Sequence, residues 1–249
     1  MAKLGYVKRV KGKGNKAKVV VSLERHAHKK KGTKTGLSGE GVRASVKKAF
    51  GFPSRLKSKG YHSTSDRAKS TLEIGQVFAV KAGRKTYAKA RERKNLGLDF
   101  IHDMAGLELM IKRFGSEEPV LRKWLDGKLS LMIADHPFKV ADSVIRKRIG
   151  LGKAVFELGA KDRLLRNLSH SWVVEAVFER LTGRKFQFTK PRNKMVRPTE
   201  GLTVSFTEKG RTILEYRKKR YDVTRNLEKI VGKDRIERIV ARAKRMRFV

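Results

Sequence analysis

The sequence predicts an α+β fold: a predominantly helical domain with a small antiparallel sheet, in a winged-helix-like order, preceded by a basic N-terminal region with a β-hairpin and extended arms. Apolar residues recur at helical spacing through most of residues 96–181. They alternate with polar residues at 202–207 and 211–217. Residues 1–95, in contrast, hold 27 Lys and Arg against 5 Asp and Glu. We therefore expect two domains, 1–95 and 96–249.

The N-terminal domain is expected to hold few regular elements between basic loops. The segment KGKGN at 11–15 supplies glycines and an asparagine for a hairpin turn. Val42, Val46 and Phe50 share one helical face, and the alternating apolar residues of 71–81 predict a strand. The expected elements are strands at 4–10, 16–23 and 71–81 and a helix at 41–50, with loops at 29–41 and 51–70.

Caps and breakers set the expected helix boundaries of the second domain. Ser116 can cap a helix that Gly127 ends, Pro137 can open the next one, and Gly183 closes the last before the sheet. The apolar period then changes from helical to alternating, with a turn at 208–210. The expected elements are helices at 98–115, 117–126, 137–149, 153–168, 171–181, 223–231 and 235–246, and strands at 184–189, 202–207 and 211–217.

The charge balance points to an anionic partner. The 249 residues include 62 Lys and Arg against 24 Asp and Glu, a net charge of +38, and such an excess repels itself in a free compact chain. Nucleic acid is the densest common polyanion. The predicted function is therefore a nucleic-acid-binding protein, on DNA rather than RNA, that coats, organises or assembles on the phosphate backbone, as in a viral, plasmid or chromatin-like nucleoprotein. Homo-oligomers on the nucleic acid are compatible with this function.

Clusters of Lys and Arg would make the phosphate contacts, because ammonium groups act as point charges and guanidinium groups bind phosphate with two parallel hydrogen bonds. The predicted nucleic-acid-binding residues are Lys29, Lys30, Lys31, Lys34, Arg43, Lys47, Lys48, Arg84, Lys85, Arg91, Arg93, Lys94, Arg146, Lys147, Arg148, Arg217, Lys218, Lys219, Arg220, Arg242, Lys244 and Arg245.

Two segments have patterns that could contact base edges. The helical patterns at 137–149 and 153–168 are joined by a glycine-containing turn, which is the outline of a helix-turn-helix. The alternative is a pair of ordinary bundle helices. The polar face of 202–217 could lie along a nucleic-acid groove, or it could simply face solvent.

The stretch His26-Ala27-His28 carries a catalytic alternative. Over these three residues it resembles the His-apolar-His strand by which rolling-circle initiators and relaxases hold a divalent metal beside a tyrosine nucleophile. The resemblance implies a metal-dependent DNA-nicking replication initiator or relaxase, with His26 and His28 as ligands and Tyr216 or Tyr221 as nucleophile. The three lysines that follow would repel a metal ion, so phosphate contact or plain surface is the preferred interpretation.

Other enzyme signatures are absent, which favours a protein that is not an enzyme. The sequence has no P-loop spacing, and without cysteine it has no disulfide, thiolate zinc site or cysteine nucleophile. We expect no cofactor and no metal. The remaining alternative is an RNA-bound structural protein such as a ribosome-associated component.

Nothing in the sequence points to a membrane or to secretion. No apolar run approaches the roughly 18 residues of a membrane-spanning helix, and the N-terminus does not have the pattern of a secretory signal. We therefore expect no membrane partner and an intracellular protein associated with nucleic acid, in the cytoplasm, nucleoid, nucleus or virion.

Overall fold

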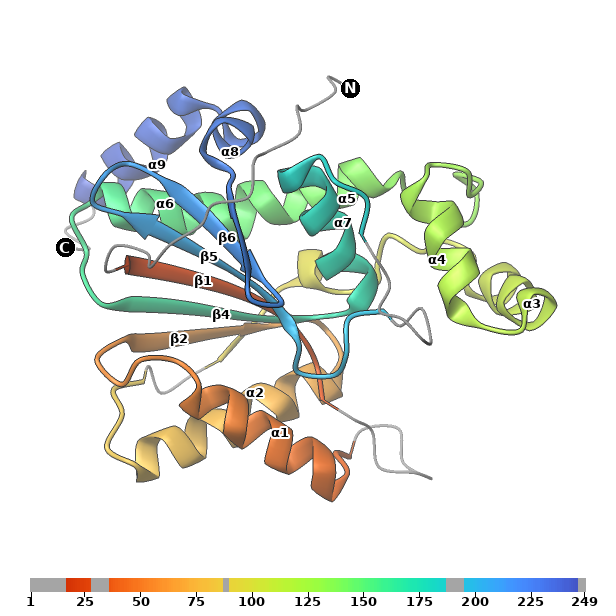
Figure 1. Ribbon diagram of the computed structural model, residues 1–249, viewed down its shortest axis with the longest axis horizontal. Helices are drawn as coiled ribbons and strands as arrows, with labels where there is room; N and C mark the ends of the chain where they lie inside the picture. The colour runs from red at the N-terminus through yellow and green to blue at the C-terminus, as the bar shows by residue number, and fades with distance from the viewer. Residues whose placement is uncertain (1–16, 28–35, 87–89, 187–194, 246–249) are drawn as a thin grey trace.

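A mixed β-sheet runs through the molecule with helices on both faces (Figure 1). The structure is a computed structural model that describes residues 17–27, 36–86, 90–186 and 195–245. Within them the strand order is β3-β2-β4-β1-β5-β6-β7. The strands are β1 (Ala17–Arg25), β2 (Lys57–His62), β3 (Arg91–Glu92), β4 (Arg163–Ser169), β5 (Gly201–Thr207), β6 (Thr212–Tyr216) and β7 (Lys219–Asp222).

The sheet has a parallel half and an antiparallel half that meet at β1. Strands β3, β2, β4 and β1 are mutually parallel, whereas β5, β6 and β7 continue the sheet in antiparallel fashion. β1 is buried on both faces, since every residue from Val19 to Glu24 is less than 9% exposed. A near-continuous apolar run such as VVVSL is typical of such a central strand.

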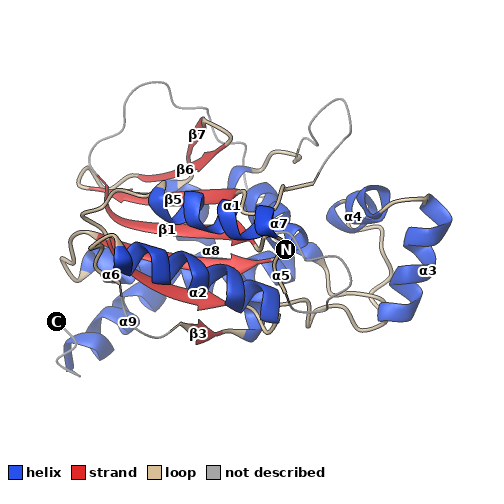
Figure 2. Cartoon of the chain, turned by 90° about the horizontal axis from the view of Figure 1, so that it is seen from below, coloured by secondary structure: helices blue, strands red, loops and turns tan. Residues whose placement is uncertain are grey.

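Helices cover both faces of the sheet. The helices are α1 (Gly39–Phe50), α2 (Asp66–Lys81), α3 (Met104–Phe114), α4 (Glu117–Leu125), α5 (Pro137–Val144), α6 (Gly150–Glu157), α7 (Ser171–Thr182), α8 (Thr224–Val231) and α9 (Lys233–Arg245), with a 3-10 turn η1 (Lys94–Leu96) and a π-helical turn η2 (Ile145–Ile149). Figure 2 shows α1 and α2 side by side across one face of the sheet, with α3 and α4 projecting beyond one end of it. Helices α5 to α9 lie on the other face.

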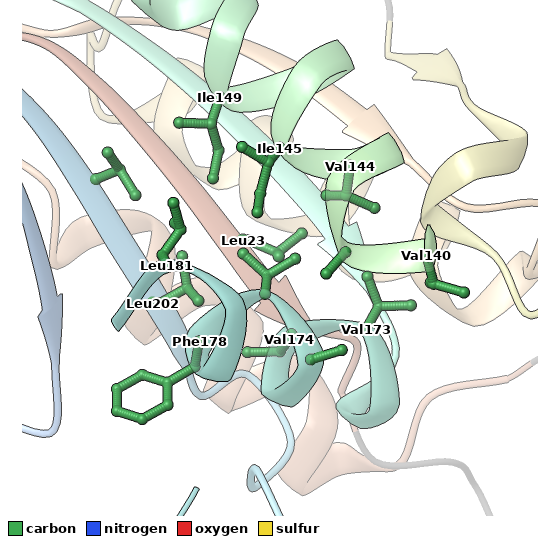
Figure 3. Close-up of a cluster of buried hydrophobic side chains, with 14 of the residues drawn as sticks. Leu23, Val140, Val144, Ile145, Ile149, Val173, Val174, Phe178, Leu181 and Leu202 are labelled. Carbon is green, nitrogen blue, oxygen red and sulfur yellow. The ribbon is translucent and has the colours of Figure 1, made fainter. Parts of the chain in front are cut away.

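The larger core lies between β1, β5 and the second helical layer. Figure 3 shows Leu23 and Leu202 from the sheet facing Ile145 and Ile149, with Leu181 of α7 beside them. These side chains are each at most 1% exposed. No helix in the described part of the chain is long and apolar enough to cross a membrane.

The predicted α+β fold with a small antiparallel sheet in winged-helix order is wrong. The molecule is an α/β protein whose sheet is built around parallel strands β1, β2 and β4. The sheet also draws strands from both sides of residue 95, since β4 from the second predicted domain lies between β1 and β2 from the first.

The error has one source in the segment 153–168, where a strand was predicted as a helix. Helix α6 ends at Glu157, and β4 begins at Arg163 after Gly159 and Asp162 take positive φ angles of 78° and 53°. Helices α5 and α6 are not separated by a turn but joined through η2, so the predicted helix-turn-helix does not exist. Gly152 lies inside α6, where a Cβ would come within 2.2 Å of Val21 on β1.

A second source is α2, which was predicted as a strand at 71–81. The residues that α2 buries are mostly small, namely Ala68, Thr71, Leu72, Gly75 and Ala79, and they recur at helical spacing. The larger apolar residues that alternate in sequence lie largely on the solvent side, where Val77, Phe78 and Val80 are 52%, 43% and 55% exposed.

Several elements of the sequence prediction are confirmed. These are α1, α4, α7, α8 and α9 and strands β1, β5 and β6, with the predicted turn between β5 and β6 containing Gly210 at φ 70°. The short strand β7 was not predicted, because its sequence KRYD reads as part of a basic cluster. The predicted strand at 4–10 lies outside the described residues.

Candidate functional site

The parallel strands carry a cluster of histidines to one edge of the sheet. His26 directly follows β1, His62 ends β2 and His170 directly follows β4. Because β1, β2 and β4 are parallel, their carboxyl ends meet at this edge, which is where open α/β sheets bind ligands.

His26 and His170 are in contact. Their ring centroids are 4.9 Å apart and the rings are nearly perpendicular, at 82°. His26 is 4% exposed, and its Nδ1 lies 3.2 Å from the carbonyl oxygen of Ala27. Since a carbonyl oxygen only accepts, Nδ1 carries the proton and the lone pair is on Nε2. His170 Nε2 lies 3.4 Å from the hydroxyl of Ser63 at the end of β2.

Both imidazoles are neutral at physiological pH. Burial, with Arg67 and Arg25 adding repulsion, lowers the pKa of His26 from 6.5 to about 4. Burial also lowers the pKa of His170 to about 3, helped by His26 and the same two arginines. A neutral imidazole with a free Nε2 lone pair is a nucleophile.

Two guanidinium groups accompany the histidines. Arg25 is the last residue of β1, and Arg67 lies in the first turn of α2. Burial lowers the pKa of Arg67, and repulsion from Arg25 adds to the effect. Among the described residues neither side chain has a carboxylate within salt-bridge distance. Two neighbouring cations that lack a salt bridge would be stabilised by a bound anion, and forked N–H groups fit a phosphate.

Local contacts hold the two strand ends and α2 together. The hydroxyl of Thr71 accepts a hydrogen bond from the N–H of Ala27 at 3.0 Å and donates to the carbonyl of Arg67 at 2.6 Å. The backbone N–H of His26 donates to the carbonyl of Ser169 at 3.1 Å. The backbone at the end of β1 is therefore tied to α2 through the Thr71 side chain and to the end of β4 through Ser169.

A cavity opens beside Arg25. Its volume is about 590 Å³, within the usual size range for small-molecule sites. Met195 and Arg197 line it from the segment before β5, and Glu40 and Glu118 line it from the starts of α1 and α4. No cluster of three or more His, Cys, Asp or Glu side chains suited to a metal ion occurs among the described residues.

The predicted catalytic residues do not come together. His26 lies in the site, whereas His28 falls outside the described residues. Tyr216 and Tyr221 are buried, at 5% and 6% exposure, and pack against Phe178. Burial raises the pKa of Tyr216, which does not suit a tyrosinate nucleophile.

The predicted phosphate-binding cations are spread over both faces of the sheet. Lys29, Lys30, Lys31 and Lys34 fall outside the described residues. The others lie on α1 (Arg43, Lys47, Lys48), after α2 (Arg84, Lys85), on β3 and η1 (Arg91, Arg93, Lys94), on η2 (Arg146, Lys147, Arg148), at β6–β7 (Arg217, Lys218, Lys219, Arg220) and on α9 (Arg242, Lys244, Arg245). Several are used internally: Arg84 donates to the carbonyl of Phe52, Arg146 to that of Ile230, and Arg217 pairs with Glu200.

Sequence reasoning missed Arg25, Arg67 and His170. A signal was present, because the two segments VVVSLERH and RLLRNLSH each place a histidine directly after a run rich in apolar residues. Predicting the second run as a helix concealed the parallel with the first. Nothing local marks Arg67, whose role depends on where α2 begins.

Comparison with known proteins identifies the fold but no family. No family model matches the chain, and no curated protein matches it. A phosphoglycerate mutase from Bacillus anthracis str. Sterne has a TM-score of 0.53 at 16% identity, over 87% of this chain and 98% of that one. Bacillus stearothermophilus YhfR has a TM-score of 0.53 at 13% identity, over 80% of this chain and 96% of that one. A mycobacterial glucosyl-3-phosphoglycerate phosphatase in complex with inorganic phosphate has a TM-score of 0.50 at 17% identity, over 80% of this chain and 96% of that one.

The predicted nucleic-acid-coating function is therefore wrong, together with its DNA or RNA partner and its nucleoprotein, viral or mobile-element assignment. The chain shares its fold with a mutase and a phosphatase. The two alternative predictions, an RNA-bound structural protein and a DNA-nicking enzyme, are wrong for the same reason. The net charge led to a wrong prediction because it counts every cation alike. Some of these cations bind carbonyl oxygens or carboxylates of the same chain and do not face a partner.

Proposed function

We propose that this protein is a phosphoryl-transfer enzyme that hydrolyses phosphomonoesters through a phosphohistidine at His26. The observation that carries the proposal is the neutral His26–His170 pair beside two cations, Arg25 and Arg67, neither of which forms a salt bridge within the described residues. A mutase and a phosphatase of phosphorylated compounds share the fold, which supports the proposal.

In the first step Nε2 of His26 attacks the phosphorus atom, and the bond from phosphorus to the ester oxygen breaks. Arg25 and Arg67 bind the non-bridging oxygens, whose charge they balance, and His170 offers one ring N–H to the same oxygens. In the second step water attacks phosphorus and the P–N bond breaks, and the proton that this water loses returns to the group that protonated the ester oxygen in the first step. Inorganic phosphate leaves, and His26 returns to its neutral form.

The departing ester oxygen needs a proton, and Glu92 is our candidate donor. β3 runs parallel to β2 and pairs Glu92 with His62, which brings this carboxyl group to the same edge of the sheet. Strands are spaced by about 4.8 Å, so the end of β3 lies about 10 Å from the end of β4. Strand β2 lies between β3 and β4, so a substrate that reaches both would lie across the end of β2.

The test is hydrolysis of p-nitrophenyl phosphate by wild type and by His26→Asn. We expect the substitution to lower kcat/KM by about 1,000-fold or more, since it removes the nucleophile. Radiolabelled substrate should leave acid-labile, base-stable label on the wild-type protein only. His102→Asn is the matched control, because His102 is exposed and pairs with Asp135 away from the site. Unchanged activity in His26→Asn, or no hydrolysis of any phosphomonoester by wild type, would overturn the proposal.

The role of Glu92 is tested separately with two leaving groups. Glu92→Gln should slow an alkyl phosphate by about 100-fold and p-nitrophenyl phosphate far less, because nitrophenolate leaves without a proton. Glu73→Gln, a change at an exposed position of α2, is the control. Equal effects on both substrates would assign the proton to another group.

A further inference from the structure

A buried carboxyl group on α7 is connected to Arg25 through one residue of the segment before β5. Glu175 is 0% exposed, and its Oε1 accepts a hydrogen bond from the backbone N–H of Val196 at 2.7 Å. The carbonyl oxygen of Val196 in turn accepts from Nη1 of Arg25 at 2.7 Å. Both backbone groups of Val196 are thus used in one chain of contacts that begins at Glu175 and ends at a guanidinium group of the site.

Arg25 requires such a restraint. Arg25 lowers the pKa of Arg67 by repulsion. Glu117, Glu175 and Glu118 attract Arg25 electrostatically, but no carboxylate in the described structure forms a salt bridge that would fix the direction of its guanidinium group. A bond to a carbonyl fixes one edge of the guanidinium without neutralising it. The remaining N–H groups, out of five in all, stay available for a phosphate.

Val196 is itself held in place on its other sides. Its side chain is 0% exposed, and the chain that follows it lies along the end of β1. There the N–H of Thr199 donates to the carbonyl oxygen of Arg25 at 3.0 Å. The N–H of Arg25 donates to the carbonyl oxygen of Glu200 at 2.9 Å. The N–H of Val196 attaches this segment to the middle of α7, and the hydroxyl of Ser171 at the start of α7 contacts Met195 beside it.

From this geometry we propose that Glu175 is a positioning residue, which orients Arg25 for phosphate binding by holding Val196. The inference rests on the proposed function, because it assumes that Arg25 binds the phosphoryl group. Glu175 does not itself touch the substrate. Its effect should therefore appear in the affinity for substrate and phosphate more than in the rate of the chemical step.

The protonation state of Glu175 selects the informative variants. Burial raises the pKa of Glu175 to about 8, and the nearby Glu117 acts in the same direction. The hydrogen bond from Val196 and the charges of Arg25 and Arg122 lower it. Tyr216 also interacts electrostatically with Glu175. The carboxyl group is thus mostly neutral at pH 7. Glutamine keeps the neutral charge and the acceptor oxygen, whereas methionine keeps the length and removes the acceptor.

The experiment compares Glu175→Gln, Glu175→Met and a control one turn later on the same helix. Glu179 also accepts a backbone N–H, from Phe186 at 2.6 Å, and pairs with Arg122, but it has no link to Arg25. We expect Glu175→Met to raise the KM for p-nitrophenyl phosphate and the Kd for orthovanadate by about 10-fold or more, with kcat changed much less. Glu175→Gln should stay close to wild type. Glu179→Met should lower Tm without changing KM.

The outcomes separate this inference from the proposed function. If His26→Asn abolishes hydrolysis but Glu175→Met leaves KM and the vanadate Kd unchanged, the positioning role is wrong and the proposed function stands. If wild type neither hydrolyses phosphomonoesters nor binds vanadate, both fail. Should Glu175→Met not fold, Glu175→Asp retracts the acceptor by one methylene and should raise both constants; wild-type values there would also contradict the inference.

Discussion

Two charged clusters lie beside the end of β1. One contains a buried salt bridge, and in the other the cations form no salt bridge within the described residues. On one face of the sheet, Arg166 of β4 pairs with Glu24 at 2.8 Å, with side-chain exposures of 4% and 1%. Next along β1, Arg25 lies close enough to Arg67 to lower its pKa, and neither has an acid in salt-bridge range among the described residues. Burial alone would raise the pKa of Glu24, yet Arg166 holds it below its usual value. One cluster contains a direct ion pair, whereas in the other Arg25 is attracted by Glu117, Glu175 and Glu118 only at longer range.

The difference teaches that a buried charge can stabilise the fold or remain available for a ligand, but not both. A pair with complete hydrogen bonding contributes to the fold, and removing one partner leaves an uncompensated charge. A buried cation without a salt bridge costs stability, and under the proposed function a bound phosphate would offset that cost.

The largest expected effect is on stability, from breaking the matched pair. Arg166→Met should lower the free energy of unfolding by about 3–5 kcal/mol, because Glu24 is left buried without its partner. Denaturant unfolding measures the loss. Glu24→Gln combined with Arg166→Met should recover most of it, and kcat/KM per folded molecule should stay near wild type. A double variant as unstable as the single one would contradict the matched-pair interpretation.

The unmatched cluster should behave in the opposite way. Arg67→Met should lower kcat/KM by about 100- to 1,000-fold, as removal of one charge-stabilising donor does in other enzymes. It should not lower Tm, since it relieves repulsion from Arg25. Thermal unfolding and steady-state kinetics on the same preparation test both parts, and a fall in Tm without loss of activity would reverse the assignment.

The histidine of the unmatched cluster predicts a pH dependence. His26 has a pKa of about 4 in the folded protein and 6.5 without perturbation. The unfolded chain therefore binds a proton between pH 6.5 and 4 that the folded chain does not, and stability falls as the pH drops through that window. The shift corresponds to about 3 kcal/mol.

His26→Asn should remove that part of the pH dependence. Unfolding free energies measured at pH 7 and pH 4 should differ by about 3 kcal/mol less in His26→Asn than in wild type. His102→Asn serves as the control and should keep the wild-type difference. A wild-type pH dependence in His26→Asn would show that this imidazole is not held neutral by burial.

The smallest effect is expected at an exposed ion pair. Arg55 and Asp162 are 2.8 Å apart, with side-chain exposures of 44% and 47%. Asp162→Asn should change the unfolding free energy by less than about 1 kcal/mol, because solvent screens the pair. Asparagine also tolerates the positive φ of 53° at this position. A loss comparable to that of Arg166→Met would mean that burial does not set the strength of these pairs.

Local pattern predicted elements well where the buried residues are large and apolar. Helix α7 buries nearly all of its residues, among them Trp172, Val173 and Phe178, and its boundaries were predicted closely. Helix α2 was predicted as a strand because its buried face is made of small residues while larger ones lie outside. The strand β4 was predicted as a helix, since RLLRNLS has neither a clear alternation nor a breaker inside it.

The candidate site was predictable only in part. His26 was singled out, but its partner was sought at His28, two residues away, whereas the structure places it at His170. A contact between residues so distant in sequence depends on β1 and β4 being neighbours in one parallel sheet. Sequence spacing carries no information on that pairing.

By itself the sequence determined the excess of positive charge, the absence of thiol chemistry and most of the helices of the second half. Whether a given cation faces a carboxylate, a carbonyl or an open cavity was decided only by the tertiary structure. The physical reason is that burial and pairing set the energy of a charge, and both depend on which strands become neighbours. Composition counts charges, but the fold decides which of them remain available for a ligand.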